Sequence, residues 1–90
     1  MRVIAGVAKG RKLVAPIGDH IRPTMDRVKE AIFNSLHSYG LVNDKSFLDL
    51  FSGTGSLGIE ALSRGANSVV FIDNHEEAID CITVNVEKLN

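Results

Sequence analysis

The stretch that decides the fold is Asp49-Leu50-Phe51-Ser52-Gly53-Thr54-Gly55-Ser56-Leu57-Gly58. Its three glycines form the pattern G-x-G-x-x-G, which permits a tight turn and lets a ligand approach the backbone closely. The hydrophobic run 46–51 before it indicates a strand, and residues 57–64 after it indicate a helix. A second hydrophobic run, 68–73, ends in Asp73, whose carboxylate is placed to accept hydrogen bonds from a ribose. The pattern predicts a site for a nucleotide-like ligand.

Asp49, at the start of this loop, bears on the class of ligand. A dinucleotide would place its pyrophosphate at the N-terminus of the following helix, and a carboxylate there would repel it. The same carboxylate would attract the ammonium group of a methionine moiety, and S-adenosylmethionine carries both that cation and a ribose. Asp49 therefore favours S-adenosylmethionine over NAD. The alternative is that Asp49 only caps a neighbouring loop.

The segments on either side complete an α/β pattern. Two β-prone runs at residues 2–6 and 11–15 predict a small basic hairpin. A helix is expected from Thr24, as its N-cap, to Gly40, and a last helix is expected to begin near His75 or Glu76. The expected apolar sides of the two helices are Val28, Ile32, Leu36 and Tyr39 in the first, and Ala78, Ile79, Ile82, Val86 and Leu89 in the last. Strand, helix, strand and helix in this order predict a parallel βαβ unit with both strands buried on both faces.

Composition and charge limit the compartment, the metal content and the binding partners that can be expected. The 90 residues hold one cysteine, Cys81, which excludes an internal disulfide and is expected to be a small packed side chain. No apolar run approaches the ~20 residues that span a bilayer, and the three histidines are scattered, so a cytoplasmic protein without a metal site is expected. Residues 1–30 hold seven basic and three acidic residues, whereas residues 31–90 hold three basic and eight acidic. This asymmetry favours a nucleic-acid partner for the N-terminus, the alternative being a solvated charged face.

The sequence from Leu48 to Ala66 resembles motif I of the bacterial 16S rRNA guanine-N2 methyltransferase family. Residues 4–6, 9–13 and 22–34 resemble the opening segments of the same family, in the same order. The run 22–34 is the more diagnostic, because motif I recurs across many methyltransferases. The resemblance implies the N-terminal part of a Rossmann-like class I methyltransferase. Residues 1–18 would form a basic RNA-contact segment, and residues 19–90 a partial S-adenosylmethionine-binding domain.

The resemblance also implies roles for individual residues. Asp49 and the loop backbone would hold the methionine end of the cofactor, Asp73 its ribose, and Asn74 would lie beside the adenine. The implied cofactor-binding residues are Thr24, Arg27, Asp49, Phe51, Ser52, Gly53, Thr54, Gly55, Asp73 and Asn74, and the implied contacts to RNA are Arg2, Lys9, Arg11, Lys12 and Arg22. Family members often carry glutamate at position 73 and an acid at position 75, a departure that changes little because either carboxylate reaches a ribose.

One part of the family pattern is missing. Amino methyltransferases carry an Asp/Asn-Pro-Pro-Tyr/Phe motif, which binds the target amine and stacks on the base, but the two prolines here, Pro16 and Pro23, lie in no such motif. The chain is therefore expected to be a fragment, truncated before the later strands and inactive alone, with no catalytic residue. Its open sheet edges predict that the isolated chain either self-associates or is partly molten.

Three functions remain in view. The first is methylation of the N2 amine of a guanine in 16S rRNA. The second is an N6-adenine methyltransferase acting on nucleic acid, which the run 22–34 disfavours. The third is a non-catalytic cofactor-binding module that dimerises.

Overall fold

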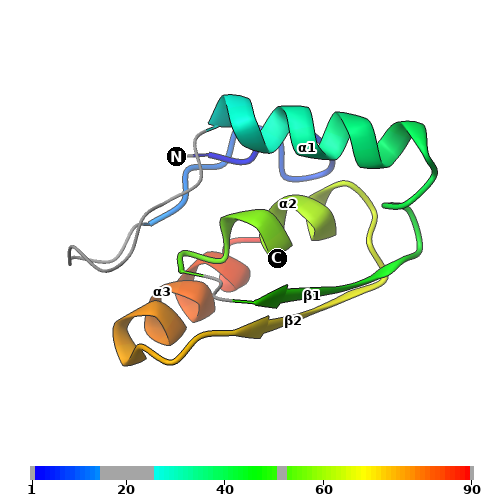
Figure 1. Ribbon diagram of the computed structural model, residues 1–90. Coiled ribbons are helices and arrows are strands. Elements are labelled where there is room, and N and C mark those ends of the chain that lie inside the picture. Colours follow the sequence, from blue (N-terminus) through cyan, green and yellow to red (C-terminus); the bar gives the residue numbers. More distant parts are fainter. Residues whose placement is uncertain (1, 15–25, 51–52, 90) are drawn as a thin grey trace.

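The computed structural model describes residues 2–14, 26–50 and 53–89. Their elements are α1 (Asp26–Ser38), β1 (Ser46–Leu50), α2 (Ser56–Ser63), β2 (Ser68–Ile72) and α3 (Glu76–Glu87). The strands pair in parallel, with Asp49 opposite Phe71, and α2 connects them. In Figure 1, α2 lies between the sheet and α1. The predicted α/β fold with a parallel βαβ unit is confirmed.

The N-terminal segment, residues 2–14, packs onto this unit as part of its core. Val3, Ala8 and Leu13 are buried against Ile59 of α2, and Phe71 packs against the same cluster. The predicted hairpin is reduced to one antiparallel bridge, between Arg2 and Lys12, with no regular strands in the described segment. The amides of Ile4, Ala5 and Ala8 donate to side chains of α2. These hydrogen bonds take the place of the backbone pairing that a longer hairpin would have. The domain boundary expected at residue 18 lies outside the described residues.

Helix α1 buries a different face from the one expected. Val28, Ile32 and Tyr39 of the predicted apolar stripe are 47%, 41% and 76% exposed, whereas Lys29 and Phe33 are buried. The buried face is thus shifted by about one residue, because Lys29 pairs with a buried carboxylate that periodicity cannot reveal. The helix ends at Ser38, and Gly40 follows in a left-handed conformation, as expected. The predicted N-cap, Thr24, lies outside the described residues.

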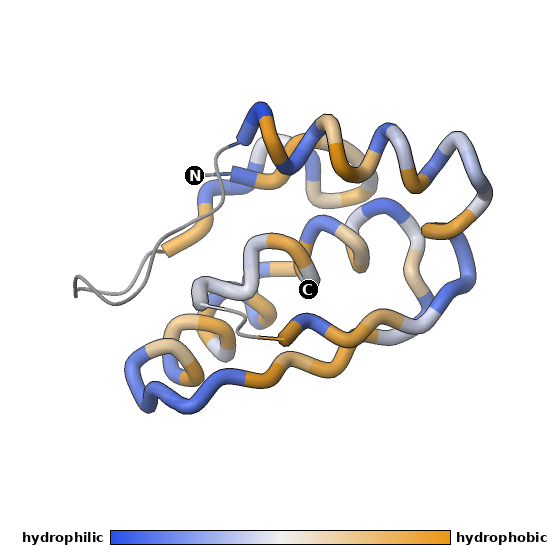
Figure 2. The backbone as a smooth tube through the Cα atoms, in the orientation of Figure 1, coloured by the Kyte–Doolittle hydropathy of each residue, from blue (hydrophilic) through white to orange (hydrophobic). Residues whose placement is uncertain are grey.

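The sheet is covered on one face only. Both strands alternate between exposed and half-buried residues, so the prediction of burial on both faces is wrong for the described part of the chain. Phe47, Asp49, Val69 and Phe71 are half-buried, whereas the apolar side chains of the other face are Leu48, Leu50, Val70 and Ile72, all exposed. Figure 2 shows the strands as a largely hydrophobic band.

Helix α3 begins at Glu76, one of the two starts that the sequence predicts, and His75 is its N-cap. It buries Ala78, Cys81, Ile82 and Asn85, so the packed role expected for Cys81 is confirmed. Ile79 is 42% exposed, which corrects its placement on the packed side. None of the helices in the described ranges has the length and apolar character needed to cross a membrane.

Candidate functional site

The glycine loop and the ends of both strands meet at one edge of the sheet. The Gly53 amide donates a hydrogen bond to Oδ2 of Asp73, at 2.9 Å, so the loop after β1 is fastened to the residue that follows β2. The His75 amide donates to the other oxygen, Oδ1, also at 2.9 Å. The hydrogen bond from Gly53 lowers the pKa of the Asp73 carboxyl below its ordinary value, and the contacts with His75 lower it further. Asp73 is therefore held as a carboxylate, the form that accepts hydrogen bonds from a diol.

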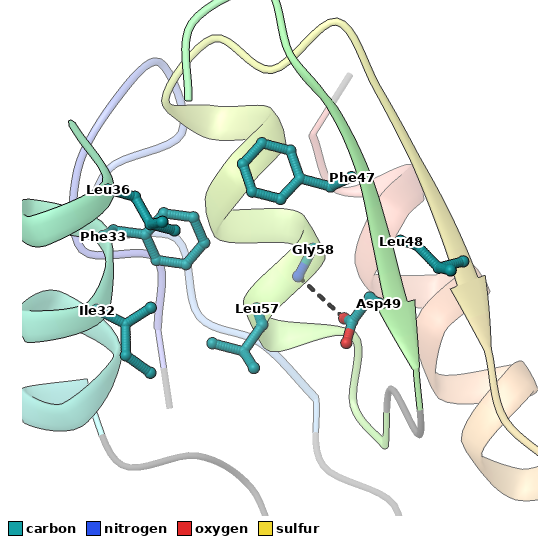
Figure 3. Close-up of a pocket in the computed structure, with 8 residues that line it drawn as sticks. All are labelled: Ile32, Phe33, Leu36, Phe47, Leu48, Asp49, Leu57 and Gly58. Atoms are coloured by element: carbon teal, nitrogen blue, oxygen red, sulfur yellow. Dashed lines mark hydrogen bonds between the residues drawn. The ribbon is translucent and has the colours of Figure 1, made fainter. Parts of the chain in front are cut away.

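Asp49 projects from β1 toward the start of α2 (Figure 3). Its Oδ2 accepts a hydrogen bond from the Gly58 amide at 3.0 Å, within the first turn of that helix. Burial raises the pKa of the Asp49 carboxyl, and nearby Asp73 raises it further, against the opposing effect of the Gly58 hydrogen bond. This hydrogen bond caps the start of α2, whereas the alternative drawn from the sequence was a cap of a neighbouring loop. The carboxylate also stands where a dinucleotide would place its pyrophosphate, which supports the argument against NAD.

The glycines of the loop have separate structural reasons. Gly53 and Gly55 both adopt positive φ angles, of 60° and 80°. A Cβ atom on Gly58 would lie 2.3 Å from Cε1 of Phe71. The first two glycines therefore shape the turn, and the third lets α2 approach β2, which is the division of roles expected for a nucleotide-binding loop.

An apolar pocket of about 160 Å³ lies beside Asp49, between α1 and β1 (Figure 3). Ile32, Phe33 and Leu36 line it from the α1 side, and Asp49 contributes an ionisable group to its lining. The remaining lining residues are Phe47, Leu48, Leu57 and Gly58. The apolar lining matches the raised pKa of Asp49, because a low-dielectric surrounding disfavours the charged carboxylate.

The structure brings most of the described residues that were predicted to bind the cofactor to this edge. Asp49, Gly53, Thr54, Gly55 and Asp73 lie at or beside the loop, and the exposed Asn74 follows Asp73 directly. Arg27 is exposed on the first turn of α1. Its helix reaches the same region, because Lys29 Nζ donates to Oγ of Ser56 at 2.8 Å. Thr24, Phe51 and Ser52 lie outside the described residues.

The cations expected to contact RNA lie on the N-terminal segment. Arg2, Lys9, Arg11 and Lys12 are all exposed, and the bridge between residues 2 and 12 brings the two ends of the basic cluster together. Arg2 Nε lies 3.9 Å from Oδ2 of Asp26, and Arg11 Nη1 donates to the Lys88 carbonyl. Arg22 lies outside the described residues. The outward side of the segment is thus basic, while its apolar side chains form part of the core.

Sequence reasoning missed three buried polar residues behind the loop. Lys29, Glu60 and Asn85 are each 0% exposed. Lys29 and Asn85 hydrogen-bond to residues 56 and 54, respectively. A polar residue inside an amphipathic helix ordinarily indicates an exposed position. The sequence did contain a signal for two of them. Lys29 lies four residues before the buried Phe33, and Asn85 lies four residues after the buried Cys81, so each shares a helix face with a buried residue.

Comparison with known proteins places this geometry among methyltransferases. The model of the family described as Conserved hypothetical protein 95 matches residues 1–90. YlbH of Bacillus subtilis is 48% identical over 99% of this chain and 47% of its own length. Ribosomal RNA small subunit methyltransferase D of Haemophilus influenzae is 43% identical over 99% of this chain and 45% of its own.

The solved structures agree with the sequence comparison. The structure of yhhF from Escherichia coli superposes with a TM-score of 0.84 at 39% identity, covering 99% of this chain and 48% of that one. The present chain therefore spans about half the length of these relatives. The match of the family model over residues 1–90, together with the glycine loop and its two carboxylates, shows that this chain belongs to the Conserved hypothetical protein 95 family.

Proposed function

We propose that this protein binds S-adenosylmethionine at the glycine loop and directs its methyl group to the N2 amine of a guanine in 16S rRNA. The observation that carries the proposal is the Asp49 carboxylate on the N-terminus of α2, beside a loop fastened to Asp73. A negative charge at that point disfavours a pyrophosphate and favours a cationic amino-acid moiety. The name of the Haemophilus influenzae relative, a small-subunit rRNA methyltransferase, supports the substrate class.

The residues at the loop fit such a cofactor. An ionised carboxylate offers about four acceptor positions. Asp73 uses three of these positions, for the Gly53 amide and for the amide and Nδ1 of His75, which leaves about one for a ribose hydroxyl. Asp49 supplies the negative charge for the ammonium group. Gly53 and Gly55 adopt the positive φ angles that this turn requires, and a Cβ atom on Gly55 would meet the side chain of Ile82 at 3.1 Å.

The cofactor, when bound, supplies an electrophilic methyl group. The role of this chain is then to bind, orient and exclude water, so that the amine attacks in line with the methyl group. Holding two reactants in this geometry supplies a large part of the rate of a transfer reaction. No residue of this chain is assigned to the proton of the amine, because the Pro-Pro motif that binds the target base is not in this sequence.

The partners follow from the same proposal. The exposed cations Arg2, Lys9, Arg11 and Lys12 would contact phosphates of ribosomal RNA in the cytoplasm, and phosphate contacts of this kind weaken as salt rises. The exposed apolar face of the sheet would also lead copies of this chain to associate. That face favours the dimerising module as the second candidate function, because large exposed apolar patches mark interaction surfaces.

Calorimetric titration of S-adenosylhomocysteine tests the cofactor assignment, with NADH as the competing ligand. Saturable binding that NADH does not reproduce is expected, and Asp73→Ala should weaken it at least tenfold. Asp80→Ala is the matched control, because Asp80 is an exposed carboxylate on α3. Binding of NADH in place of S-adenosylhomocysteine, or equal effects of the two substitutions, would contradict the proposal.

A further inference from the structure

Two buried polar side chains each join the N-terminal segment to the glycine loop. The first is Lys29 of α1. Its Nζ donates to the carbonyl oxygen of Arg2 at 2.7 Å and to Oγ of Ser56 at 2.8 Å. Arg2 begins the described N-terminal segment, and Ser56 begins α2 directly after the loop. One ammonium group thus connects the basic segment to the end of the loop.

The second is Asn85 of α3, which makes the same connection at the other end. Its Oδ1 accepts from the Val14 amide at 2.7 Å, and its Nδ2 donates to the Val14 carbonyl at 2.9 Å. The same Nδ2 donates to the carbonyl of Thr54, within the loop, at 3.0 Å. The amide side chain therefore binds the far end of the segment and the middle of the loop together.

Glu60 of α2 binds the N-terminal segment between these two connections. Its carboxylate accepts from the amides of Ile4 and Ala5, at 2.9 and 3.0 Å, and lies 3.6 Å from Lys29 Nζ. Arg64 Nε donates to the same carboxylate at 2.7 Å. Buried polar groups are costly unless all their partners are present. A shift of the N-terminal segment would therefore break several of these hydrogen bonds. Two of the donors, Lys29 Nζ and Asn85 Nδ2, also bind residues at the loop.

We propose that Lys29 and Asn85 are positioning residues that couple the basic N-terminal segment to the cofactor loop, so that RNA and cofactor each favour the binding of the other. The inference rests on the proposed function, because it assigns RNA to the segment and S-adenosylmethionine to the loop. An RNA that orders the outward face of the segment would also stabilise the carbonyls of Arg2 and Val14. Through Lys29 and Asn85, the same ordering would reach Ser56 and Thr54.

Ser63 provides a matched control. Its Oγ donates to the Ala5 carbonyl at 2.7 Å and accepts from the Ala8 amide at 2.9 Å. It is buried like the other two residues, and these hydrogen bonds hold the segment from the C-terminal end of α2, away from residues 54–56. Ser63→Ala therefore loosens the segment while leaving both connections to the loop in place.

The test measures a thermodynamic coupling factor in the full-length protein. The dissociation constant of S-adenosylhomocysteine is determined by calorimetry with and without saturating 16S rRNA transcript. Coupling between two sites is reciprocal and typically amounts to roughly 5- to 150-fold. We expect about tenfold tighter binding in the presence of RNA. Lys29→Met and Asn85→Ala should each bring the ratio close to one, Lys29→Arg should restore much of it, and Ser63→Ala should preserve it.

A ratio of one in the wild type, with both ligands shown to bind, would overturn the coupling while leaving the proposed function intact. Failure of the wild type to bind S-adenosylhomocysteine would overturn both. Equal losses in Ser63→Ala and Asn85→Ala would show a purely structural role. If a variant fails to fold, hydrogen exchange on the wild type tests the coupling between the N-terminal segment and the loop. S-adenosylhomocysteine should slow exchange at the amides of Ile4, Ala5 and Val14, and unchanged rates there would overturn the inference.

Discussion

The Nζ atom of Lys29 lies 3.6 Å from Oε1 of Glu60, and neither side chain exposes any surface. Burial lowers the pKa of Lys29, while the charges of Glu60 and Asp26 oppose that effect. The two members of the pair are not equivalent. Glu60 has Arg64 and two backbone amides besides Lys29, whereas Lys29 has Glu60 as its buried counter-charge.

Because the two residues have different numbers of partners, replacing Glu60 and replacing Lys29 should lower the free energy of unfolding by different amounts. Glu60→Ala leaves the Lys29 ammonium group without its buried counter-charge and two backbone amides without their acceptor, and breaking a buried pair in this way typically costs about 3–5 kcal/mol. Lys29→Met leaves Glu60 with three donors and removes the two hydrogen bonds that Nζ donates, which should together cost about 1–3 kcal/mol. Urea unfolding of the two variants checks the order. A larger loss for Lys29→Met than for Glu60→Ala would contradict the assignment of the pair.

Gly6 predicts a second stability effect. A Cβ atom there would lie 1.9 Å from the carbonyl oxygen of Ser63, and the residue has a φ of 90°. Gly10 has nearly the same φ, 86°, but a Cβ atom at this position would meet nothing within 4 Å among the described residues. Gly10→Ala therefore reports the backbone strain alone, of order 1–3 kcal/mol. Gly6→Ala should cost a further ~1–3 kcal/mol, because the segment must move off α2. Equal melting temperatures for the two variants would refute the close approach.

Asp49 predicts a conflict between stability and binding. Because its folded pKa is raised, the folded state binds the proton more tightly than the unfolded state. Stability therefore falls as pH rises from the ordinary value of 3.8 through the raised value, and the penalty is fully present above it. Asp49→Asn should be more stable than the wild type at neutral pH, because its amide oxygen can still accept from Gly58. It should also bind S-adenosylhomocysteine more weakly.

Unfolding in urea between pH 3 and pH 8, together with calorimetry at pH 7.5, tests both halves of that prediction. The control is Asp44→Asn, because Asp44 is an exposed carboxylate in the turn before β1. Tighter binding by Asp49→Asn would show that Asp49 acts as a helix cap and does not attract the ligand.

The contrast between the loop and α1 shows what the sequence could predict. The glycines at 53, 55 and 58 and the acids at 49 and 73 serve local geometry, so their spacing was sufficient to place them. The burial of Lys29 depends on Glu60, which is 31 residues away in the sequence, and hydrophobic periodicity has no information about such a pair. The apolar runs correctly predicted the two strands, but which face is covered depends on what packs there.

The exposed face of the sheet carries the last prediction. Leu48 and Val70 are partners across the two strands and are 59% and 57% exposed. Removing apolar surface from water contributes roughly 25 cal/mol per Å², so contiguous exposed leucine, valine and isoleucine side chains favour association of this chain with itself. Sedimentation velocity over a hundredfold concentration range should show a concentration-dependent oligomer, and Leu48→Lys with Val70→Thr should shift it to monomer. Val7→Lys is the control, because Val7 is 92% exposed on the N-terminal segment, away from the sheet. A wild type that stays monomeric throughout, or a control that dissociates the oligomer equally well, would show that this face does not mediate association.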